Sequence, residues 1–426
     1  MKLLVVGGGG REHAIIKKLR ENPQVTEIVA LPGNAGIAQD ATCIPIKATD
    51  IDAIADYAGK SAIDFAVVAP DDPLALGCVD RLHALGIPCF GPDAKAARIE
   101  ASKVFAKNLM KKYGIPTAAY EVFDDPKAAL QYVKTAPLPL VVKADGLALG
   151  KGVVICFTRQ DAEAAVTAAM VESVFGKSGS RIVIEEFLEG PEVSVLAFTD
   201  GHVVKPMVPS MDHKRAGDGD TGLNTGGMGT IAPNPCYTPE VAQRCMKEIF
   251  LPTLNAMNKE GCPFKGCLYF GLMVTKDGPK VIEYNCRFGD PETQVVLPLL
   301  KSDLLTIMQA VEGETLADTP VEFYEGAACC VMLASGGYPG KYEKGKVISM
   351  GNADSMAQVY HSGTAKNESG DFITAGGRVL GVSCTAETLE NAIEKAYAAA
   401  SEISWDGMML RHDIGRRALA ILEKQR

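Results

Sequence analysis

The opening of the chain limits its fold more than any other segment. The apolar run Leu3–Val6 leads into four consecutive glycines, Gly7–Gly10, and a helical pattern over Glu12–Arg20 follows. A strand that passes through glycines into a helix is the first unit of a parallel sheet covered by helices. Because a further apolar strand, Ile28–Leu31, continues the alternation, the first part of the chain is predicted to be a doubly wound parallel α/β domain.

The length of the chain predicts several domains. At roughly 150 residues per domain, a chain of 426 residues holds about three. We expect an N-terminal α/β domain over 1–101, a central domain over 102–324 that contains a small α+β lobe at about 119–190, and a C-terminal α+β domain over 325–426. Ser102 is predicted to cap the helix that opens the central domain.

The composition limits where the chain works and what it binds. No apolar run approaches the ~18 residues that cross a bilayer, and the first apolar run predicts a strand, not a signal peptide. Twelve cysteines without a Cys-x-x-Cys pair indicate buried reduced thiols rather than disulfides or a zinc site. A net charge of −9 argues against binding to nucleic acid or to an anionic membrane. A cytoplasmic protein with small-molecule partners is therefore expected.

The glycines after the first strand offer a phosphate site. The amides of Gly8, Gly9 and Gly10 can cradle a phosphate at the helix N-terminus, and Arg11 adds a positive charge. A tight strand-to-helix turn without a ligand is the alternative. A dinucleotide site is excluded, because the spacing lacks a third glycine and the second strand leads into Pro32-Gly33 without an acidic ribose ligand.

A second glycine-rich segment lies between two predicted strands. It begins at Lys143 and superficially resembles a Walker A loop. However, only three residues separate Gly146 from Gly150, and neither Ser nor Thr follows Lys151. Strands on both sides predict a hairpin instead, and the hairpin over 144–152 can fold over a triphosphate as a flexible lid. A solvated hairpin with surface lysines is the alternative.

A strand end that carries two carboxylates is the third candidate. Backbone groups and an apolar side chain at this position can hold a flat base, although carboxylates at strand ends are usually only solvated. The residues concerned are Glu185, Glu186, Phe187 and Leu188.

The strongest local pattern is a polar strand face formed by Glu283 and Asn285. Strand side chains alternate between faces, so these two point to the same side, about 7 Å apart. A carboxylate and an amide oxygen suit Mg²⁺, which takes few protein ligands and completes its octahedron with water and phosphate oxygens. Because Arg287 and Asp290 follow at once, a metal site is favoured over a polar strand face in water.

The segment 212–233 is rich in glycine and lacks apolar periodicity, so it is predicted to be a long loop. Lys214 and Arg215 at its start, with the bare amides of Asn224–Gly229 near its end, suit anionic oxygens. A loop without a ligand is the alternative. His213 is predicted to be structural, because no Ser or Cys nucleophile is paired with it.

Together these segments resemble the glycinamide ribonucleotide synthetase (phosphoribosylamine:glycine ligase) family of the ATP-grasp superfamily over the whole length of the chain. The most specific motif is Arg287–Gln294. Five supporting motifs follow the family's order along the chain: Gly9–Ala14, Pro32–Gly36, Asp212–Arg215, Asn224–Gly229 and Arg411–Gly415. The resemblance implies that the central domain has an ATP-grasp fold whose small lobe is a mobile lid.

The resemblance also implies roles for single residues. The residues that contact ATP would be Lys103, Lys143, Glu185, Glu186, Phe187, Leu188, Glu192, Arg215 and Asn224. Mg²⁺, with Mn²⁺ as an alternative, would bind Glu283 and Asn285. The catalytic residues would be Lys143, Arg287 and Asp290. Glycine and phosphoribosylamine would contact Arg287, Asp290 and a set of loop residues: Gly8, Gly9, Gly10, Arg11, Asp212, Lys214, Gly226, Gly227 and Met228.

Two positions depart from the superfamily's pattern. Many ATP-grasp enzymes carry a further acidic metal ligand on the strand before the hairpin, but Phe270–Met273 has none. Asp71 stands where the family commonly has glutamate. The part that Asp71 takes in substrate binding therefore stays open.

The implied reaction joins glycine to 5-phosphoribosylamine with ATP. It gives glycinamide ribonucleotide, ADP and phosphate through a glycyl phosphate, as a step of de novo purine biosynthesis. Two alternatives are another ATP-grasp carboxylate–amine ligase or carboxylase, and a non-catalytic ATP-binding regulator. The regulator predicts lost lysines and lost metal ligands, whereas those named above are all present. A monomer or weak homodimer is expected.

Overall fold

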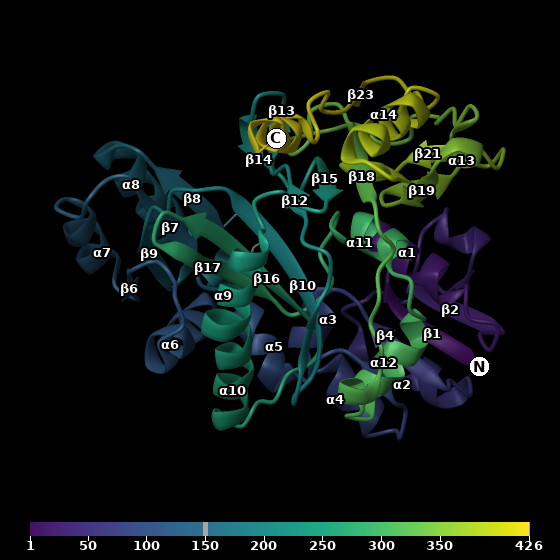
Figure 1. The fold of residues 1–426 in the computed structure, drawn as a ribbon, viewed down its shortest axis with the longest axis horizontal. Coiled ribbons are helices and arrows are strands. Elements are labelled where there is room, and N and C mark those ends of the chain that lie inside the picture. The colour runs from purple at the N-terminus through teal and green to yellow at the C-terminus, as the bar shows by residue number, and fades with distance from the viewer. Residues whose placement is uncertain (148–151, 426) are drawn as a thin grey trace.

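The computed structural model describes residues 1–147 and 152–425. Its N-terminal sheet has five parallel strands in the order β3-β2-β1-β4-β5, which runs outward from β1 in both directions (Figure 1). This order places the connecting helices on both faces, so the predicted doubly wound α/β fold is confirmed. The strands are β1 (Lys2–Gly7), β2 (Glu27–Pro32), β3 (Thr42–Cys43), β4 (Phe65–Val68) and β5 (Cys89–Phe90). The helices are α1 (Gly10–Leu19), α2 (Ile51–Lys60), α3 (Asp71–Ala75), α4 (Cys78–His83) and α5 (Ala94–Ala101).

Helix α6 (Lys103–Tyr113) follows the N-terminal sheet. The Ser102 hydroxyl caps it by accepting a hydrogen bond from the Phe105 amide at 3.1 Å. Gly114 ends the helix in the left-handed conformation, at φ 67°, which glycine adopts without steric cost. The helix predicted to begin after Ser102 is therefore confirmed.

The small lobe is built on a four-stranded antiparallel sheet in the order β6-β9-β7-β8. Strands β7 and β8 pair with Lys143 opposite Val153, so the predicted hairpin is confirmed for the strands that flank its glycines. Residues 148–151 of the predicted lid lie outside the described residues. The lobe comprises β6 (Tyr120–Phe123), α7 (Pro126–Val133), β7 (Leu140–Ala144), β8 (Val153–Cys156), α8 (Arg159–Val166) and β9 (Ile182–Glu186).

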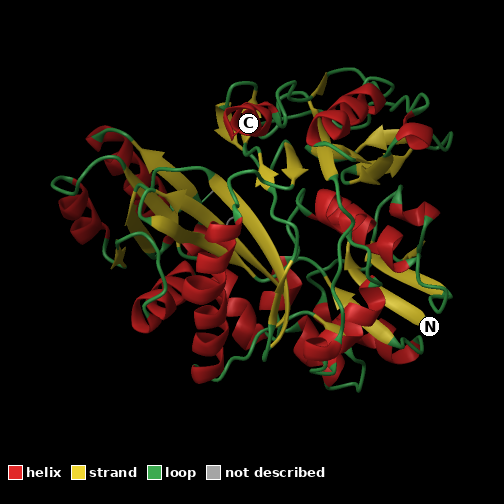
Figure 2. Ribbon diagram, viewed as in Figure 1, coloured by secondary structure: helices red, strands yellow, loops and turns green. Residues whose placement is uncertain are grey.

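A second four-stranded antiparallel sheet, in the order β11-β10-β16-β17, lies against this lobe. Figure 2 shows the strands of the two sheets beside each other, with α9 and α10 in front of the second sheet. The ring of Phe270 packs on Phe250 at 4.3 Å and on Tyr284 at 5.6 Å, which fixes the helical layer to the sheet. The elements are β10 (Glu192–Asp200), β11 (Val204–Pro206), α9 (Pro239–Cys245), α10 (Leu251–Lys259), β16 (Lys265–Thr275) and β17 (Gly278–Asn285).

The C-terminal sheet joins strands from distant parts of the chain in the order β12-β15-β18-β22-β19, and β23 pairs with β18. Helix α14 packs on β18 and β22, and helix α15 ends the described chain (Figure 1). The elements are β12 (Met211–Asp212), β15 (Gly229–Ala232), β18 (Ala327–Ser335), β19 (Gln358–His361), β22 (Arg378–Ala386), α14 (Leu389–Ala400), β23 (Met408–Met409) and α15 (Arg416–Gln425).

The prediction that residues 212–233 form a long loop is wrong. Besides β12 and β15, this segment holds the hairpin of β13 (Arg215–Gly217) and β14 (Thr221–Asn224). Strand β15 pairs with β18, which begins almost a hundred residues later, with Gly229 opposite Val331. Strand β15 could not be predicted from local periodicity, because it pairs with a strand far along the chain, whereas β13 and β14 are short strands of three and four residues that show no apolar alternation.

One apolar core joins the N-terminal and C-terminal sheets. It includes Leu3 of β1, Ile15 of α1 and Met332 of β18, and all three are fully buried. Helices α11 (Thr293–Leu299) and α12 (Leu304–Glu312) contribute their buried faces to the same cluster. Within the described ranges, no helix is both long and apolar enough to span a membrane.

Polar contacts also tie the glycine loop after β1 to the C-terminal sheet. The side-chain amide of Asn34 donates to the carbonyls of Gly8 and His361, at 2.9 and 2.8 Å. The backbone amide of His361 donates to His13 Nδ1 at 2.9 Å. His361 is buried, and this burial, with the charge of His13, lowers the pKa of His361 to about 3. A neutral imidazole is therefore part of the junction between the two sheets.

The buried imidazole predicts a pH-dependent stability. The unfolded chain protonates His361 near its ordinary value of 6.5, whereas the folded chain does not until about 3, so stability is complete above 6.5 and is lost as pH falls. Between pH 7.5 and 5.5 the unfolding free energy should fall by about 1.4 kcal/mol from this residue alone. His361→Gln should remove that part of the fall, measured by urea unfolding at both pH values. The exposed His412→Gln is the control, and equal losses in His361→Gln and the unchanged protein would contradict the assignment.

Candidate active site

Strand β17 presents Glu283 and Asn285 on one face, as the strand period predicts. Lys214 Nζ lies 3.1 Å from Glu192 Oε2 and 3.9 Å from Glu283 Oε1. Burial raises the pKa of Glu283, but the charges of Lys214, Lys143 and other cations outweigh it, so the pKa lies below its ordinary value. A carboxylate whose side chain is 32% exposed is therefore held ionised among cations.

Arg287 lies beside this face and depends on a buried carboxylate. Its Nη2 donates to Asn285 Oδ1 at 3.1 Å and to Glu100 Oε1 at 3.0 Å. The other Glu100 oxygen accepts a hydrogen bond from the Cys286 amide at 2.7 Å. Burial raises the pKa of Glu100, and the charge of Arg287 opposes that rise. Glu100 was not among the predicted site residues, because nothing near it in the sequence signals a partner almost two hundred positions away.

Two lysine side chains form ion pairs with the buried Glu185 of β9 in the small lobe. Lys107 Nζ lies 2.9 Å from Glu185 Oε2, and Lys143 Nζ lies 3.0 Å from Oε1 in a contact that is ionic rather than a well-directed hydrogen bond. Lys143 also donates to the Ile282 carbonyl of β17 at 3.0 Å. Burial lowers the pKa of Lys107 to about 8. Lys107 was missed, although its position four residues after Lys103 on one helix face could have indicated it.

The predicted base-binding segment separates into inward and outward side chains. Glu185 is buried against the lysines, whereas Glu186 is exposed and accepts a hydrogen bond from the Ala119 amide at 3.2 Å. Phe187 and Leu188 are half-buried, and the Phe187 ring lies 6.0 Å from that of Phe157. An apolar wall beside a strand end is thus available to a planar group.

The glycine loop after β1 is closed by its own helix. The Gly9 amide donates to Glu12 Oε2 at 2.6 Å, so this amide is engaged within the protein. The other Glu12 oxygen pairs with Arg11 Nε at 2.6 Å. Gly8 must be glycine, because a Cβ there would lie 2.4 Å from the Gly33 carbonyl oxygen.

Arg11 and Arg287 converge on one carbonyl. Both guanidinium groups donate to the Phe288 oxygen, Arg11 at 3.2 Å and Arg287 at 3.3 Å. Two positive charges held this close repel each other, and an anion between them lowers that energy. The pair therefore suits an anionic substrate group at the glycine loop.

Asp290 is fully engaged and lies next to Gly9 and Gly10. Its Oδ1 accepts from the Gln294 amide at 2.6 Å, and its Oδ2 accepts from Arg378 Nη2 at 2.9 Å. Burial raises the pKa of Asp290, but Arg378 and other cations lower it below its ordinary value. Asp290 is thus an ionised carboxylate that connects Gln294 and Arg378. Arg378, on the distant strand β22, was missed for the same reason as Glu100.

The glycine-rich segment 212–233 lies close to Asp290 and Arg378. Arg378 Nη1 donates to the carbonyls of Gly226 and Gly227, at 2.7 and 3.3 Å. A Cβ on Gly227, whose φ is 112°, would lie 2.6 Å from Asp212 Oδ1, so both residues belong to one packed turn. The Met228 side chain is fully buried. Arg378 thereby fixes the predicted substrate segment against the Arg287–Gln294 motif.

The oxygen donors around Glu283 limit which metal could bind. Of the residues that the structure describes, no group of three or more His, Cys, Asp or Glu side chains is arranged to hold a metal. Glu283 and Asn285 are only two oxygen-bearing side chains, and Asn285 shares its oxygen with Arg287. Such a sparse pair fits a hard divalent ion that takes its other ligands from water and phosphate, and does not fit a zinc site.

Two antiparallel sheets that carry lysines on one side and a carboxylate strand on the other define an ATP-grasp protein. Models of the three domains of one family match the chain in order: "Phosphoribosylglycinamide synthetase, N domain" over residues 1–100, its "ATP-grasp (A) domain" over 101–293 and its "C domain" over 328–417. The chain therefore belongs to the phosphoribosylglycinamide synthetase family.

Individual relatives agree with the family models. The chain is 46% identical to the phosphoribosylamine–glycine ligase of Vibrio vulnificus strain YJ016, over 99% of each chain. The crystal structure of the phosphoribosylamine–glycine ligase of Thermotoga maritima superposes with a TM-score of 0.86 at 36% identity and covers 97% of this chain and all of that one. The biotin carboxylase domain of Hydrogenobacter thermophilus 2-oxoglutarate carboxylase superposes with a TM-score of 0.72 over 96% of this chain and 91% of its own, at 19% identity, which shows a shared fold alone.

Glu100 predicts the first test of the site. Glu100→Gln keeps an acceptor for the Cys286 amide but removes the charge that faces Arg287, and a charged hydrogen bond of this kind is worth about 1.5–3 kcal/mol. We expect ATP-dependent ADP release to fall roughly 10- to 100-fold, measured as initial rates below the melting transition of the variant, whose melting temperature should also be lower because a buried ion pair is broken. Glu322→Gln, which breaks an exposed ion pair with Lys301, should leave both unchanged. Full turnover in Glu100→Gln would show that Arg287 does not need this partner.

Proposed function

We propose that the chain ligates glycine to 5-phosphoribosylamine, with conversion of ATP to ADP and phosphate, in purine biosynthesis. The observation that carries this proposal is the match of all three family domains, together with a 46% identical phosphoribosylamine–glycine ligase of the same length. The cations gathered around Glu283 support it, because a nucleotide triphosphate needs such neutralisation.

The chemistry explains why ATP is needed. A carboxylate is a poor electrophile and forms only a salt with an amine. One glycine carboxylate oxygen therefore attacks the γ-phosphorus of ATP, the bond from that phosphorus to the β-γ bridging oxygen breaks, and glycyl phosphate and ADP form. The amine of phosphoribosylamine then attacks the glycyl carbonyl carbon, phosphate leaves, and the nitrogen loses a proton to give the amide.

The protein's part is positioning and neutralisation of charge, since phosphoryl transfer requires little covalent chemistry of the enzyme. Lys103, Lys143 and Lys214 surround Glu283 and offset the charge of the phosphates. The base lies along Glu185–Leu188, and Glu192 binds the ribose. Arg215 and Asn224, which face each other across the β13–β14 hairpin, complete the nucleotide site.

Glu283 and Asn285 hold Mg²⁺, with Mn²⁺ as an alternative. The ion supplies charge neutralisation at the phosphate oxygens when it is bound. Support comes from the donor pair itself, which is oxygen-only, sparse and partly exposed. Arg287 donates to the Asn285 amide oxygen at 3.1 Å and so fixes the orientation of a side chain that would hold the ion.

The substrates lie on the side of the glycine loop. Arg287 and Arg11 bind anionic groups of glycine and phosphoribosylamine, and Asp290 orients both the loop and Arg378. The remaining contacts come from Gly8, Gly9, Gly10, Asp212, Lys214, Gly226, Gly227 and Met228. Strands β7 and β8 flank the lid predicted over 144–152, whose residues 148–151 lie outside the described residues, and a lid there would keep water from the acyl phosphate.

The broader organisation is also part of the proposal. The domains span 1–101, 102–324 and 325–426, and the second contributes β12 and β15 to the sheet of the third. All twelve cysteines, each within the described residues, are free thiols, which supports a reducing cytosol as the site of action. The chain acts as a monomer or a weak homodimer.

Glu283→Gln tests the metal site. The substitution keeps the shape of the side chain and removes its charge, so we expect glycine-dependent ADP release to fall by at least about a hundredfold, with the fold intact. Asp277→Asn, in the exposed turn of the same β16–β17 hairpin, is the matched control and should keep full activity. Initial rates at several Mg²⁺ concentrations are the measurement. Unchanged turnover in Glu283→Gln would remove Glu283 from the metal site.

Omission of each substrate tests the reaction itself. ADP release should require glycine and freshly generated phosphoribosylamine together, and one amide should form for each ADP. Bicarbonate should not replace glycine. Release of ADP with bicarbonate, or with glycine and an unrelated amine, would indicate a different ATP-grasp ligase or carboxylase. Binding of ATP without turnover under any of these conditions would indicate a regulator.

A further inference from the structure

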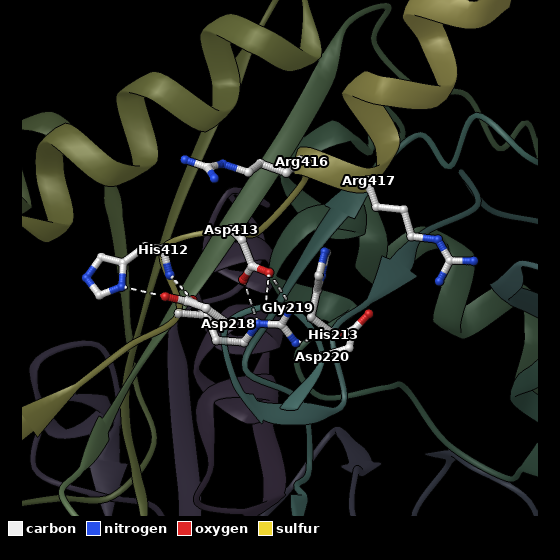
Figure 3. A pocket seen from close by; sticks show the side chains of 9 residues that line it. His213, Asp218, Gly219, Asp220, His412, Asp413, Arg416 and Arg417 are labelled. Carbon is white, nitrogen blue, oxygen red and sulfur yellow. Dashed lines mark hydrogen bonds and ion pairs between the residues drawn. The ribbon is translucent and has the colours of Figure 1, made fainter. Parts of the chain in front are cut away.

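The C-terminal segment 411–413 grips the turn of the β13–β14 hairpin, and Figure 3 shows this cluster from close by. Arg411 Nη1 donates to Asp220 Oδ1 at 2.8 Å. The Gly219 amide donates to Asp413 Oδ2 at 2.8 Å, and the His412 amide donates to Asp218 Oδ1 at 2.7 Å. Each of the three turn residues thus has a partner from three consecutive residues that lie nearly two hundred positions later.

The turn has a conformation that benefits from this grip. Gly219 and Asp220 both lie in the left-handed region, at φ 68° and 56°. Asp220 is not a glycine, so its backbone carries a cost of about 1 kcal/mol in that region. The Arg411 ion pair offsets this cost only while the turn stays docked.

Arg411 is the buried centre of the latch formed by residues 411–413. Its side chain is only 2% exposed. Asp413 binds it with two parallel hydrogen bonds, at 2.8 and 2.9 Å, and the Arg215 carbonyl accepts a further one at 3.2 Å. Removing one partner of a buried charge leaves the other uncompensated. The contacts of residues 411–413 with the turn of the hairpin therefore form or break together.

The cavity beside the latch, of about 240 Å³, is not itself a built anion site. Arg416 and Arg417, which line it, point away from the cluster and away from each other (Figure 3). The guanidinium of Arg411 is committed to Asp413 and Asp220. The contacts therefore favour a role in holding the hairpin over a role in binding a ligand.

His213, which lies just before the β13–β14 hairpin, makes a second contact with the same C-terminal segment. The Gly415 amide donates to His213 Nε2 at 3.2 Å, so Nδ1 carries the proton and donates to the Gly229 carbonyl, also at 3.2 Å. Burial, followed by the charge of Arg411, lowers the pKa of His213 to about 4, consistent with this neutral ring. Lys214 thus stands between two residues, His213 and Arg215, that the segment 411–415 holds directly.

We propose that Arg411 and Asp413 are positioning residues for the ligase reaction, which hold Lys214 in place from the far side of the hairpin. The ammonium of Lys214 lies 3.1 Å from Glu192 and 3.9 Å from Glu283, and its neighbours on both sides, His213 and Arg215, are held by the C-terminal segment. This role rests on the proposed function, in which Arg215 and Asn224 complete the nucleotide site, while Lys214 offsets the charge of the phosphates and also contacts a substrate. The C-terminal domain thereby affects the binding of ATP without contacting the nucleotide.

The test weakens the latch at its exposed end. In Asp220→Asn, whose side chain is 54% exposed, the fold should be kept while Arg411 loses a charged partner. We expect KM for ATP to rise roughly three- to tenfold, with kcat changed less than twofold. Asp218→Asn, which weakens the contact with His412, should act in the same direction and serves if Asp220→Asn folds poorly.

A double-mutant cycle separates positioning from a general structural effect. If the latch acts through Lys214, Asp220→Asn should add nothing to KM for ATP in a Lys214→Ala background. Asp406→Asn, which breaks an exposed ion pair with Lys346 in the same domain, is the control and should leave KM unchanged.

The outcomes distinguish the latch from the proposed function on which it rests. If Lys214→Ala itself leaves KM for ATP unchanged, the assignment of Lys214 in the proposed function fails. If Lys214→Ala raises KM while Asp220→Asn and Asp218→Asn do not, or if the effects add fully, the latch proposal fails and the proposed function stands.

Discussion

The charge balance around Glu283 is the constraint on which the site depends. A carboxylate withdrawn from water resists ionisation, and burial alone would raise its pKa. Lys214, Lys143 and Lys103 reverse that effect, and each comes from a different element: the glycine-rich segment, β7 and α6. The sheets, the helix and the glycine-rich segment therefore meet at Glu283, and each brings one of the cations that lower its pKa.

A further ring of ion pairs fixes the cations themselves. Glu185 binds two lysines, Glu100 binds Arg287, and Asp290 binds Arg378. Breaking such a buried pair typically costs about 3–5 kcal/mol, since it leaves one charge uncompensated. These carboxylates therefore contribute to stability, and each also holds a flexible cationic side chain in one position.

The sequence predicts the parts of this arrangement that are local. The Leu3–Val6 strand with its glycines, and the alternating face of β17, follow from spacing within a few residues, and the structure has both. Glu100 and Arg378 could not be predicted, because their partners are set by packing between segments far apart in the chain. The Gly9 amide shows the reverse case. The sequence pattern predicts that this amide binds a phosphate, whereas in the structure it donates a hydrogen bond to the capping carboxylate of Glu12, three residues later.

The hydrophobic cores indicate which unit can move against the rest. The N-terminal and C-terminal sheets share one core with α11 and α12, so separating them exposes apolar surface. The small lobe instead has a core of its own, formed by residues between 129 and 184. Its contacts with β17 include polar ones, such as Lys143 with the Ile282 carbonyl and the neighbouring Thr117 with the Val281 carbonyl. Water can replace hydrogen bonds of that kind at little net cost, whereas it cannot replace apolar packing. The two sheets that hold the glycine loop are therefore joined by apolar packing, whereas the small lobe has its own core and meets its neighbours through polar contacts as well, among them the buried ion pair of Glu185 with Lys107.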